Sequence, residues 1–161
     1  MSEVGYNRAA AVEYAKKWAL SRNPAYYSFD GIGGDCTGFV SQSVYAGAGV
    51  MNYTPTYGWY YISPDDRAPA WTGVEYFFNF ITENQGPGPY GEETPLSSAR
   101  LGDVIQLGDR EGGFYHSMII CGFRGRTPLI CAHSQDAYMR PLTAYRAARV
   151  RYIHIIGVRT E

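Results

Sequence analysis

The chain has 161 residues, 45% of them hydrophobic, which suits one domain with a sizeable core. Only 18% of the residues are charged and the formal net charge is −1, so neither nucleic acid nor an anionic membrane is indicated as a partner. The three cysteines make no disulfide framework and have no zinc-type spacing, so no metal or cofactor is expected.

The N-terminal sequence "MSEVGYNRAA" holds no apolar signal-peptide core, and no apolar run is long enough to predict a transmembrane helix. We therefore expect the chain as given to be soluble and cytoplasmic. An extracellular location is the alternative, if the chain is a fragment of a longer protein or leaves the cell by a non-classical route.

Helices are predicted in the first half of the chain. Residues 7–21 carry apolar side chains at helical spacing, with Asn7 as the N-cap. A second helix is expected to begin at Cys36 and to end at the glycines around Gly49, because glycine favours the left-handed conformation that closes helices. A third helix is predicted over residues 73–83.

The remaining segments predict loops and strands. Residues 51–72 are aromatic and irregular, and "ENQGPGPYGEETP" (83–95) is expected to be a loop. Four β-branched or apolar runs predict strands over residues 103–107, 116–123, 128–133 and 151–158. Because helices come first and antiparallel strands second, the sequence predicts an α+β fold in a single domain, residues 1–161.

The stretch "GGDCTGFVSQ" (33–42) places a cysteine at the start of the second helix. The free N–H groups of a helix start favour a thiolate, lower the cysteine pKa and can receive an oxyanion. The pair Gly33 and Gly34 allows a tight turn and leaves room for a substrate carbonyl. Asp35 can cap the helix or fix the turn, and so support the thiol. Cys36 is therefore a candidate nucleophile.

A thiolate nucleophile needs a general base. His116 opens a predicted strand just after a glycine-containing loop, where a base can reach a cleft. His133 ends the next predicted strand, so the two histidines are expected to be neighbours in a hairpin, with His133 orienting His116. Asp136 is the alternative orienting residue. The third histidine, His154, is expected to be a packed residue or one at the edge of the sheet.

Four motifs carry a resemblance to a known family: "YNRAAAVEYAKKWALSRNPAYYSFD", "DCTGFVSQSVYAG", "GWYYISPDD…AWT" and "HSMII". Over residues 6 to about 142 the chain resembles the putative amidase domain family of bacteria, within the papain-like NlpC-type and CHAP cysteine peptidase superfamily. The resemblance implies a papain-like fold, in which N-terminal helices, including the nucleophile helix, pack on a C-terminal antiparallel sheet. One position departs from the family, since Gly38 stands where many members have Asn.

The resemblance also implies roles for individual residues. It implies that Cys36 is the nucleophile, that His116 is the base and that His133 is the third polar residue. It further implies a tyrosine upstream of the nucleophile whose hydroxyl faces the thiol, for which Tyr26 is the best match and Tyr27 the alternative.

Several other residues have types and positions that suit core packing, and some of them also suit a substrate cleft. Tyr57, Trp59 and Tyr60 are expected either to line a substrate cleft or to cover the core. Cys121 and Cys131 alternate with apolar residues in predicted strands and are expected to be core thiols.

The expected function is cysteine-dependent hydrolysis of amide bonds, with a bacterial cell-wall peptide or a similar peptidoglycan fragment as the substrate. Alternatives within the fold are an amidase or acyltransferase with a cytosolic substrate, and a delivered antibacterial effector held in check by an inhibitor or immunity protein. A non-catalytic binding module that kept the cleft is the alternative from another class. The oligomeric state is not predicted.

Overall fold

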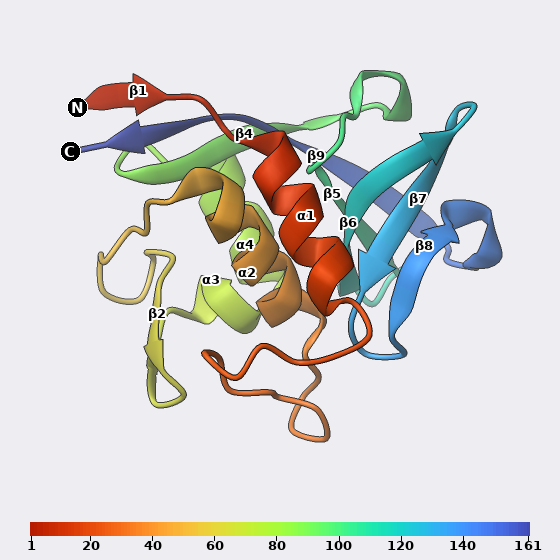
Figure 1. Cartoon of the computed structure of the whole chain (residues 1–161), viewed down its shortest axis with the longest axis horizontal. Coiled ribbons are helices and arrows are strands. Elements are labelled where there is room, and N and C mark those ends of the chain that lie inside the picture. Colours follow the sequence, from red (N-terminus) through yellow and green to blue (C-terminus); the bar gives the residue numbers. More distant parts are fainter.

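The computed structural model describes all 161 residues and shows an α+β fold in which N-terminal helices pack on an antiparallel sheet (Figure 1). The helices gather on one side, strands β5 to β8 stand beside them, and β1, β4 and β9 pass across their upper ends. The helices are α1 (Arg8–Trp18), α2 (Cys36–Ala48), α3 (Pro69–Thr72) and α4 (Val74–Glu83), with short 3-10 helices at Leu96–Ser98 and Leu142–Ala144.

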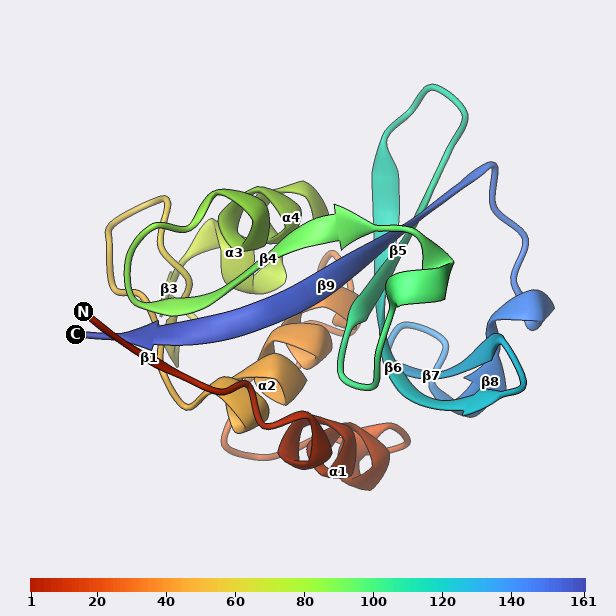
Figure 2. The ribbon, with the colours of Figure 1, turned by 90° about the horizontal axis from the view of Figure 1, so that it is seen from above.

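Seven strands form the main sheet in the order β1-β9-β5-β6-β7-β8, and β4 pairs with β9 on its other edge. All of these pairs are antiparallel. Because β1 pairs with the end of β9, the two termini lie side by side (Figure 2). The main-sheet strands are β1 (Ser2–Val4), β4 (Gly88–Thr94), β5 (Val104–Gly108), β6 (Phe114–Arg124), β7 (Thr127–Ala132), β8 (Ala137–Pro141) and β9 (Arg149–Thr160), while β2 (Tyr61–Ser63) and β3 (Asp66–Arg67) form a separate hairpin.

The sheet buries apolar side chains on both faces. The larger cluster lies between the sheet and the helices and includes Phe39 and Val40 of α2 with Ile119 of β6. The smaller cluster lies on the opposite face, where Met118 and Ile120 pack with residues of the neighbouring strands. Alternate residues of β6 therefore face the helices or the second cluster, as the two-residue period of a strand requires.

The helix predictions are confirmed in existence and nearly in extent. Asn7 caps α1, because its Oδ1 accepts a hydrogen bond from the Ala10 N–H at 3.0 Å, but the helix ends at Trp18 rather than at residue 21. Helix α2 begins at Cys36 and closes at Gly49, whose φ is 70°. Helix α4 matches the predicted third helix.

All four predicted strands are present, but the prediction of a loop over residues 83–95 was wrong. Gly88–Thr94 forms β4 and pairs with β9 in a register that shifts between Tyr90 and Gly91. The local sequence, rich in proline and glycine, has no strand periodicity, so the strand exists only because β9 offers it a partner. Strands β1 and β8 were missed for the same reason.

The two remaining cysteines are core thiols, as predicted: Cys121 is 4% exposed and Cys131 is fully buried, both on the helix side of the sheet. A hydrogen bond that the Cys121 thiol donates to Cys131, together with burial, raises the pKa of Cys121 well above that of an ordinary thiol. Of the helices, none combines the length and the apolar character that crossing a membrane requires.

Candidate active site

Cys36 is the first residue of α2 and its side chain is half-buried. Phe39 donates the first hydrogen bond of the helix, to the Asp35 carbonyl at 3.0 Å. The N–H groups of Cys36, Thr37 and Gly38 therefore have no acceptor within the helix. The sulfur contacts the Thr37 hydroxyl at 3.8 Å. The thiol thus lies at a helix start with free backbone donors, as the sequence predicts.

Asp35 stands at the N-cap position, yet its carboxylate makes no capping bond to the helix. One oxygen accepts from the Phe29 N–H at 3.0 Å, and the other lies 2.7 Å from the Nδ1 atom of His133. The side chain is 2% exposed. The carboxylate therefore makes no hydrogen bond to the first turn of α2, and the N–H groups beside the thiol keep no side-chain acceptor.

His133 is buried against the start of α2, where its ring stacks on Phe39 with the two centroids 4.0 Å apart. Besides the Nδ1 contact to Asp35, its Nε2 atom lies 2.7 Å from the Trp18 carbonyl and 3.0 Å from the Arg22 guanidinium. Both ring nitrogens are engaged. The expected hydrogen bond from His133 to His116 is therefore not formed, since Asp35 takes its place.

The alternative orienting residue, Asp136, is also engaged elsewhere. Its carboxylate binds Arg22 at 2.8 Å, and the same guanidinium binds Asp30 at 2.6 Å. The hydrogen bond with Arg22 holds the pKa of the Asp30 carboxyl below its usual value. Arg22 thus connects the loop that precedes α2 to the turn between β7 and β8. The sequence around Arg22, just after α1, does not predict this connection.

The turn between β7 and β8 is strained and touches the same helix start. Ser134 and Gln135 have φ values of 62° and 71°, in the left-handed region that few non-glycine residues adopt. The Ser134 hydroxyl accepts from the Asp35 N–H at 3.1 Å. A Cβ on Gly34, whose φ is 96°, would lie 3.1 Å from this hydroxyl oxygen, so the glycine predicted to make a tight turn also permits this approach.

His116 lies near the start of β6, next to the irregularity at the end of β5. Its neighbour Ser117 faces α2, whereas the His116 ring points the other way and lies 6.3 Å from the Tyr145 ring between centroids. No hydrogen bond joins His116 to Cys36. Burial lowers the pKa of His116, so its imidazole is neutral at pH 7.

The hydroxyls of Thr37 and Ser117, which the sequence does not mark as functional, lie between the thiol and the sheet. The Thr37 and Ser117 oxygens are 2.9 Å apart, and the Gln106 amide donates to Ser117 at 3.1 Å. Their only signal in the sequence is position, since Thr37 follows Cys36 and Ser117 follows His116.

A buried polar network extends from these hydroxyls into the sheet. The Nε and Nη2 atoms of Arg151 donate to the side-chain Oε1 atom of Gln106 at 2.9 and 2.6 Å, and the same guanidinium binds the Glu75 carboxylate at 2.6 Å. Its guanidinium lies between the rings of Phe78 and Phe114, 3.6 and 3.7 Å from their centroids. The network fixes the Gln106 amide, and through it the Ser117 hydroxyl beside the start of α2.

The tyrosines upstream of Cys36 make no hydrogen bond to the thiol. Tyr26 packs between Tyr61 and Trp71, with centroid separations of 5.1 and 6.1 Å, and burial raises its pKa to about 12. The side chain of Tyr27 is exposed, and its backbone N–H donates to the Tyr61 hydroxyl at 2.9 Å.

The aromatic segment divides between core and surface. Trp59 is fully buried and donates to the Ser41 hydroxyl at 3.0 Å, so this residue covers the core and lines no cleft. Tyr60 is half-buried beside Tyr53. Tyr57 is 78% exposed and lines a pocket in which Cys36 has no part.

The third histidine and the acidic side chains form no metal site. His154 bonds through Nδ1 to the buried Asp103 at 2.8 Å, in agreement with its expected packing role. Nowhere in the chain do three or more His, Cys, Asp or Glu side chains come together so as to hold a metal ion.

Comparison with known proteins connects this geometry to a family. Two curated proteins of Bacillus subtilis (strain 168) are similar: "Uncharacterized protein YhbB", 30% identical over 166 residues, covers 97% of this chain and 52% of its own length. "Uncharacterized protein YjcM", 33% identical over 140 residues, covers 82% of this chain and 32% of its own. The chain thus spans about half of one relative and a third of the other, and no solved structure matches it. A family model described as "Putative amidase domain" matches residues 5–156, and the chain belongs to that family.

Proposed function

We propose that the chain is a papain-like cysteine hydrolase that cleaves amide bonds, with Cys36 as its nucleophile. Membership of an amidase-domain family supports the reaction class. The observation that supports Cys36 as the nucleophile is that the Asp35 carboxylate bonds to Phe29 and His133, which leaves the first N–H groups of α2 free beside a half-buried thiol. A helix start that has lost its side-chain cap is suited to hold a developing negative charge.

In the proposed reaction the Cys36 sulfur attacks the carbonyl carbon of the substrate, and the carbonyl oxygen gains the negative charge. Backbone N–H groups at the start of α2 donate to this oxygen. The thiol proton passes to the base and then to the leaving nitrogen as the C–N bond breaks, which leaves a thioester on Cys36. Water, deprotonated by the same base, attacks the thioester and releases the acid and the free thiol.

We assign the base to His116 because its ring nitrogens form no hydrogen bond in the structure, whereas both nitrogens of His133 are engaged. Its lowered pKa keeps the ring in the neutral form that can accept a proton. In the structure the ring lies on the side of the sheet away from α2, so the assignment requires the start of β6 to rearrange and turn the ring toward Cys36 in the substrate complex. His133 then serves as a positioning residue that fixes Asp35 and the start of α2.

The substrate proposed for this chemistry is the peptide part of the bacterial cell wall, an assignment that rests on analogy with the superfamily. Purified peptidoglycan and the isolated chain provide the test. Incubation should release new amino groups, and the rate should fall by at least 10²-fold, the usual scale for loss of a nucleophile, in both Cys36→Ala and Cys36→Ser.

The two Cys36 variants should keep the melting temperature of the parent, because the thiol is half-buried and forms only one weak contact. Release of amino groups at the parental rate by Cys36→Ala would assign the nucleophile to another residue. Release of reducing sugars without amino groups would assign a different bond.

A further inference from the structure

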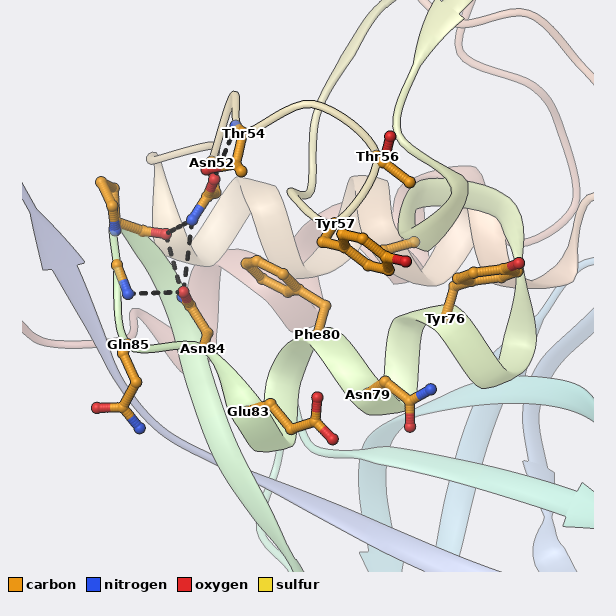
Figure 3. Close-up of a pocket in the computed structure, with 13 residues that line it drawn as sticks. Asn52, Thr54, Thr56, Tyr57, Tyr76, Asn79, Phe80, Glu83, Asn84 and Gln85 are labelled. Atoms are coloured by element: carbon orange, nitrogen blue, oxygen red, sulfur yellow. Dashed lines mark hydrogen bonds between the residues drawn. The ribbon is translucent and has the colours of Figure 1, made fainter.

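A pocket of about 420 Å³ lies between the outer face of α4 and the loop of residues 52–58 (Figure 3). Its volume is within the range of small-molecule sites. Cys36, His116 and His133 are absent from its lining, so the pocket is separate from the candidate active site.

One wall of the pocket is a stripe along α4. Tyr76, Asn79, Phe80 and Glu83 are spaced so that they share one face of the helix. Phe80 is 6% exposed and forms the apolar floor, whereas Tyr76 is 53% exposed. Figure 3 shows this row of side chains along the helix, with the rings of Tyr76 and Phe80 pointing toward the loop.

The opposite wall is a loop held in a defined shape. Tyr57 projects from it with 78% of its surface exposed. The loop is closed by the Gly58 N–H, which donates to the Thr54 carbonyl at 2.9 Å, and Thr56 adopts a φ of 67°. The ring of Tyr57 is therefore presented to the pocket by a constrained backbone, and its exposure is not explained by packing.

The far end of the pocket is fixed by two asparagines. The Asn84 amide donates to the Pro87 and Pro89 carbonyls at 3.0 Å each, and the Asn52 amide donates to the Pro87 carbonyl at 3.0 Å. These bonds preorganise the end of the pocket, so little ordering remains to be done when a ligand binds.

Three polar side chains at the rim have no hydrogen-bond partner within the protein. Asn79, Glu83 and Gln85 are exposed, and Figure 3 shows no hydrogen bond from their side chains to the other pocket residues. Two amides and one carboxylate provide both donors and acceptors along the rim of the pocket. Glu83 is the one charged residue of the lining, so the pocket offers no cation to an anionic ligand.

We infer that this pocket binds a neutral saccharide. A pyranose ring has an apolar C–H face that packs on an aromatic ring, and a rim of hydroxyls that both donate and accept hydrogen bonds. Tyr57 and Tyr76 supply the aromatic faces, and the rim amides and carboxylate match the hydroxyls. A proline-rich peptide would also pack on tyrosines, but a lining with only four hydrophobic residues among 13 favours the polyhydroxylated ligand.

Titration of the isotope-labelled chain with tetra-N-acetylchitotetraose and with cellotetraose, followed by amide chemical shifts, tests the inference. At least one of these saccharides should bind saturably, with shifts centred on residues 54–57 and 76–86. Tyr57→Ala and Tyr76→Ala should each weaken binding about ten-fold, the scale typical of losing one stacked aromatic ring. Both side chains are exposed, so the variants should fold.

The matched control is Tyr138→Ala, which removes a similarly exposed tyrosine on β8, 49% exposed and outside the pocket, and should leave the affinity unchanged. Cys36→Ala should bind the saccharide with parental affinity, so the test of the saccharide site does not depend on the proposed hydrolysis. Three outcomes would overturn the inference: no saturable binding of either saccharide, parental affinity in Tyr57→Ala and Tyr76→Ala, or saturation of the pocket by a proline-rich decapeptide alone.

Discussion

At the scale of single residues, the contact between Asp35 and His133 does most to shape the candidate active site. The two side chains are 2% and 1% exposed and meet at 2.7 Å. A buried polar group that loses its partner keeps its desolvation cost, so each of these side chains depends on the other. Asp35 would otherwise be free to cap α2 and to bring its charge toward Cys36.

Asp35→Ala and His133→Ala should therefore each lower the free energy of unfolding by about 2–3 kcal/mol, the typical cost of leaving a buried partner unsatisfied. The double variant should cost less than the sum, because each single change already removes the interaction. Urea unfolding of the four proteins measures this coupling. Asp65→Ala, in the exposed turn between β2 and β3, is the control and should change stability by less than about 0.5 kcal/mol. Strictly additive losses would contradict a direct interaction.

His116 should respond to pH in a direction set by its burial. Its folded pKa lies below the ordinary value of about 6.5, so the unfolded chain binds more protons below that pH. The contribution of His116 to stability is therefore full above pH 6.5 and is lost as the pH falls toward the lower folded pKa. Proton NMR titration of the imidazole signals, with His116→Gln to assign them, measures this pKa. A value at or above 6.5 would contradict the burial argument.

The sequence located individual residues well where the helix start set their position, and poorly where partners came from distant segments. Cys36 lies at the predicted helix start because Gly34 and Asp35 turn the chain there. The partner of His133 could not be read from the hairpin, since Asp35 reaches it from a loop 98 positions away. Trp59 was ambiguous because a fully buried tryptophan and a cleft tryptophan look alike in a segment without periodicity.

At the scale of elements, α2 carries two interior glycines with opposite surroundings. A Cβ on Gly38 would meet its nearest atoms at 3.6 and 3.7 Å, which is ordinary contact. A Cβ on Gly47 would lie 2.5 Å from the Asn7 carbonyl oxygen, which is too close. Gly47 therefore allows the start of α1 to approach the end of α2, whereas Gly38 has no steric reason to be glycine.

Gly38→Ala should raise the free energy of unfolding by up to about 1 kcal/mol, because alanine is the better helix former. Gly47→Ala should lower it by about 1–3 kcal/mol, the usual cost of overpacking. Thermal and urea unfolding of the two variants give the comparison within one helix. A loss of stability in Gly38→Ala would show that the space beside Asp35 is tighter than the structure indicates.

The strands show where prediction from local sequence ends. β5, β6 and β7 contain apolar runs because both faces of their sheet are buried, and β9 alternates buried residues with less buried ones, and both patterns are visible in the sequence. β4 lies at an edge and takes its conformation from seven pairings with β9. No local pattern could have shown that partner, because the paired residues lie 58 to 71 positions apart in the chain, from Thr94 with Tyr152 to Gly88 with Arg159.

At the scale of the whole molecule, the candidate active site is assembled from three separate parts: the loop before α2, the start of β6 and the turn after β7. Arg22 joins the first of these to the last through Asp30 and Asp136. Because its side chain is 29% exposed, these ion pairs are only partly shielded from water and salt.

Arg22→Ala should therefore lower the free energy of unfolding by only about 1 kcal/mol while loosening the loop it holds. Amide hydrogen exchange should become faster over residues 23–35 and 133–137 and stay unchanged in β9. The exchange should also speed up in the parent protein at high salt, which screens the same pairs. Uniformly faster exchange in every strand would mean that Arg22 supports the global fold and not this local link.

The pairing of Cys36 with His116 during catalysis is the central claim, and the rate of amide hydrolysis by His116→Ala, measured beside the rate of Cys36 alkylation, tests it most directly. Mass spectrometry of the Cys36 peptide separates its alkylation by iodoacetamide from that of the buried Cys121 and Cys131. His116→Ala should lower the rate of amide hydrolysis by at least about 10²-fold, the lower end of the contribution of a general base. Alkylation of Cys36 should continue at the parental rate, because the His116 ring lies away from the thiol in the structure. Hydrolysis at the parental rate by His116→Ala would contradict the pairing.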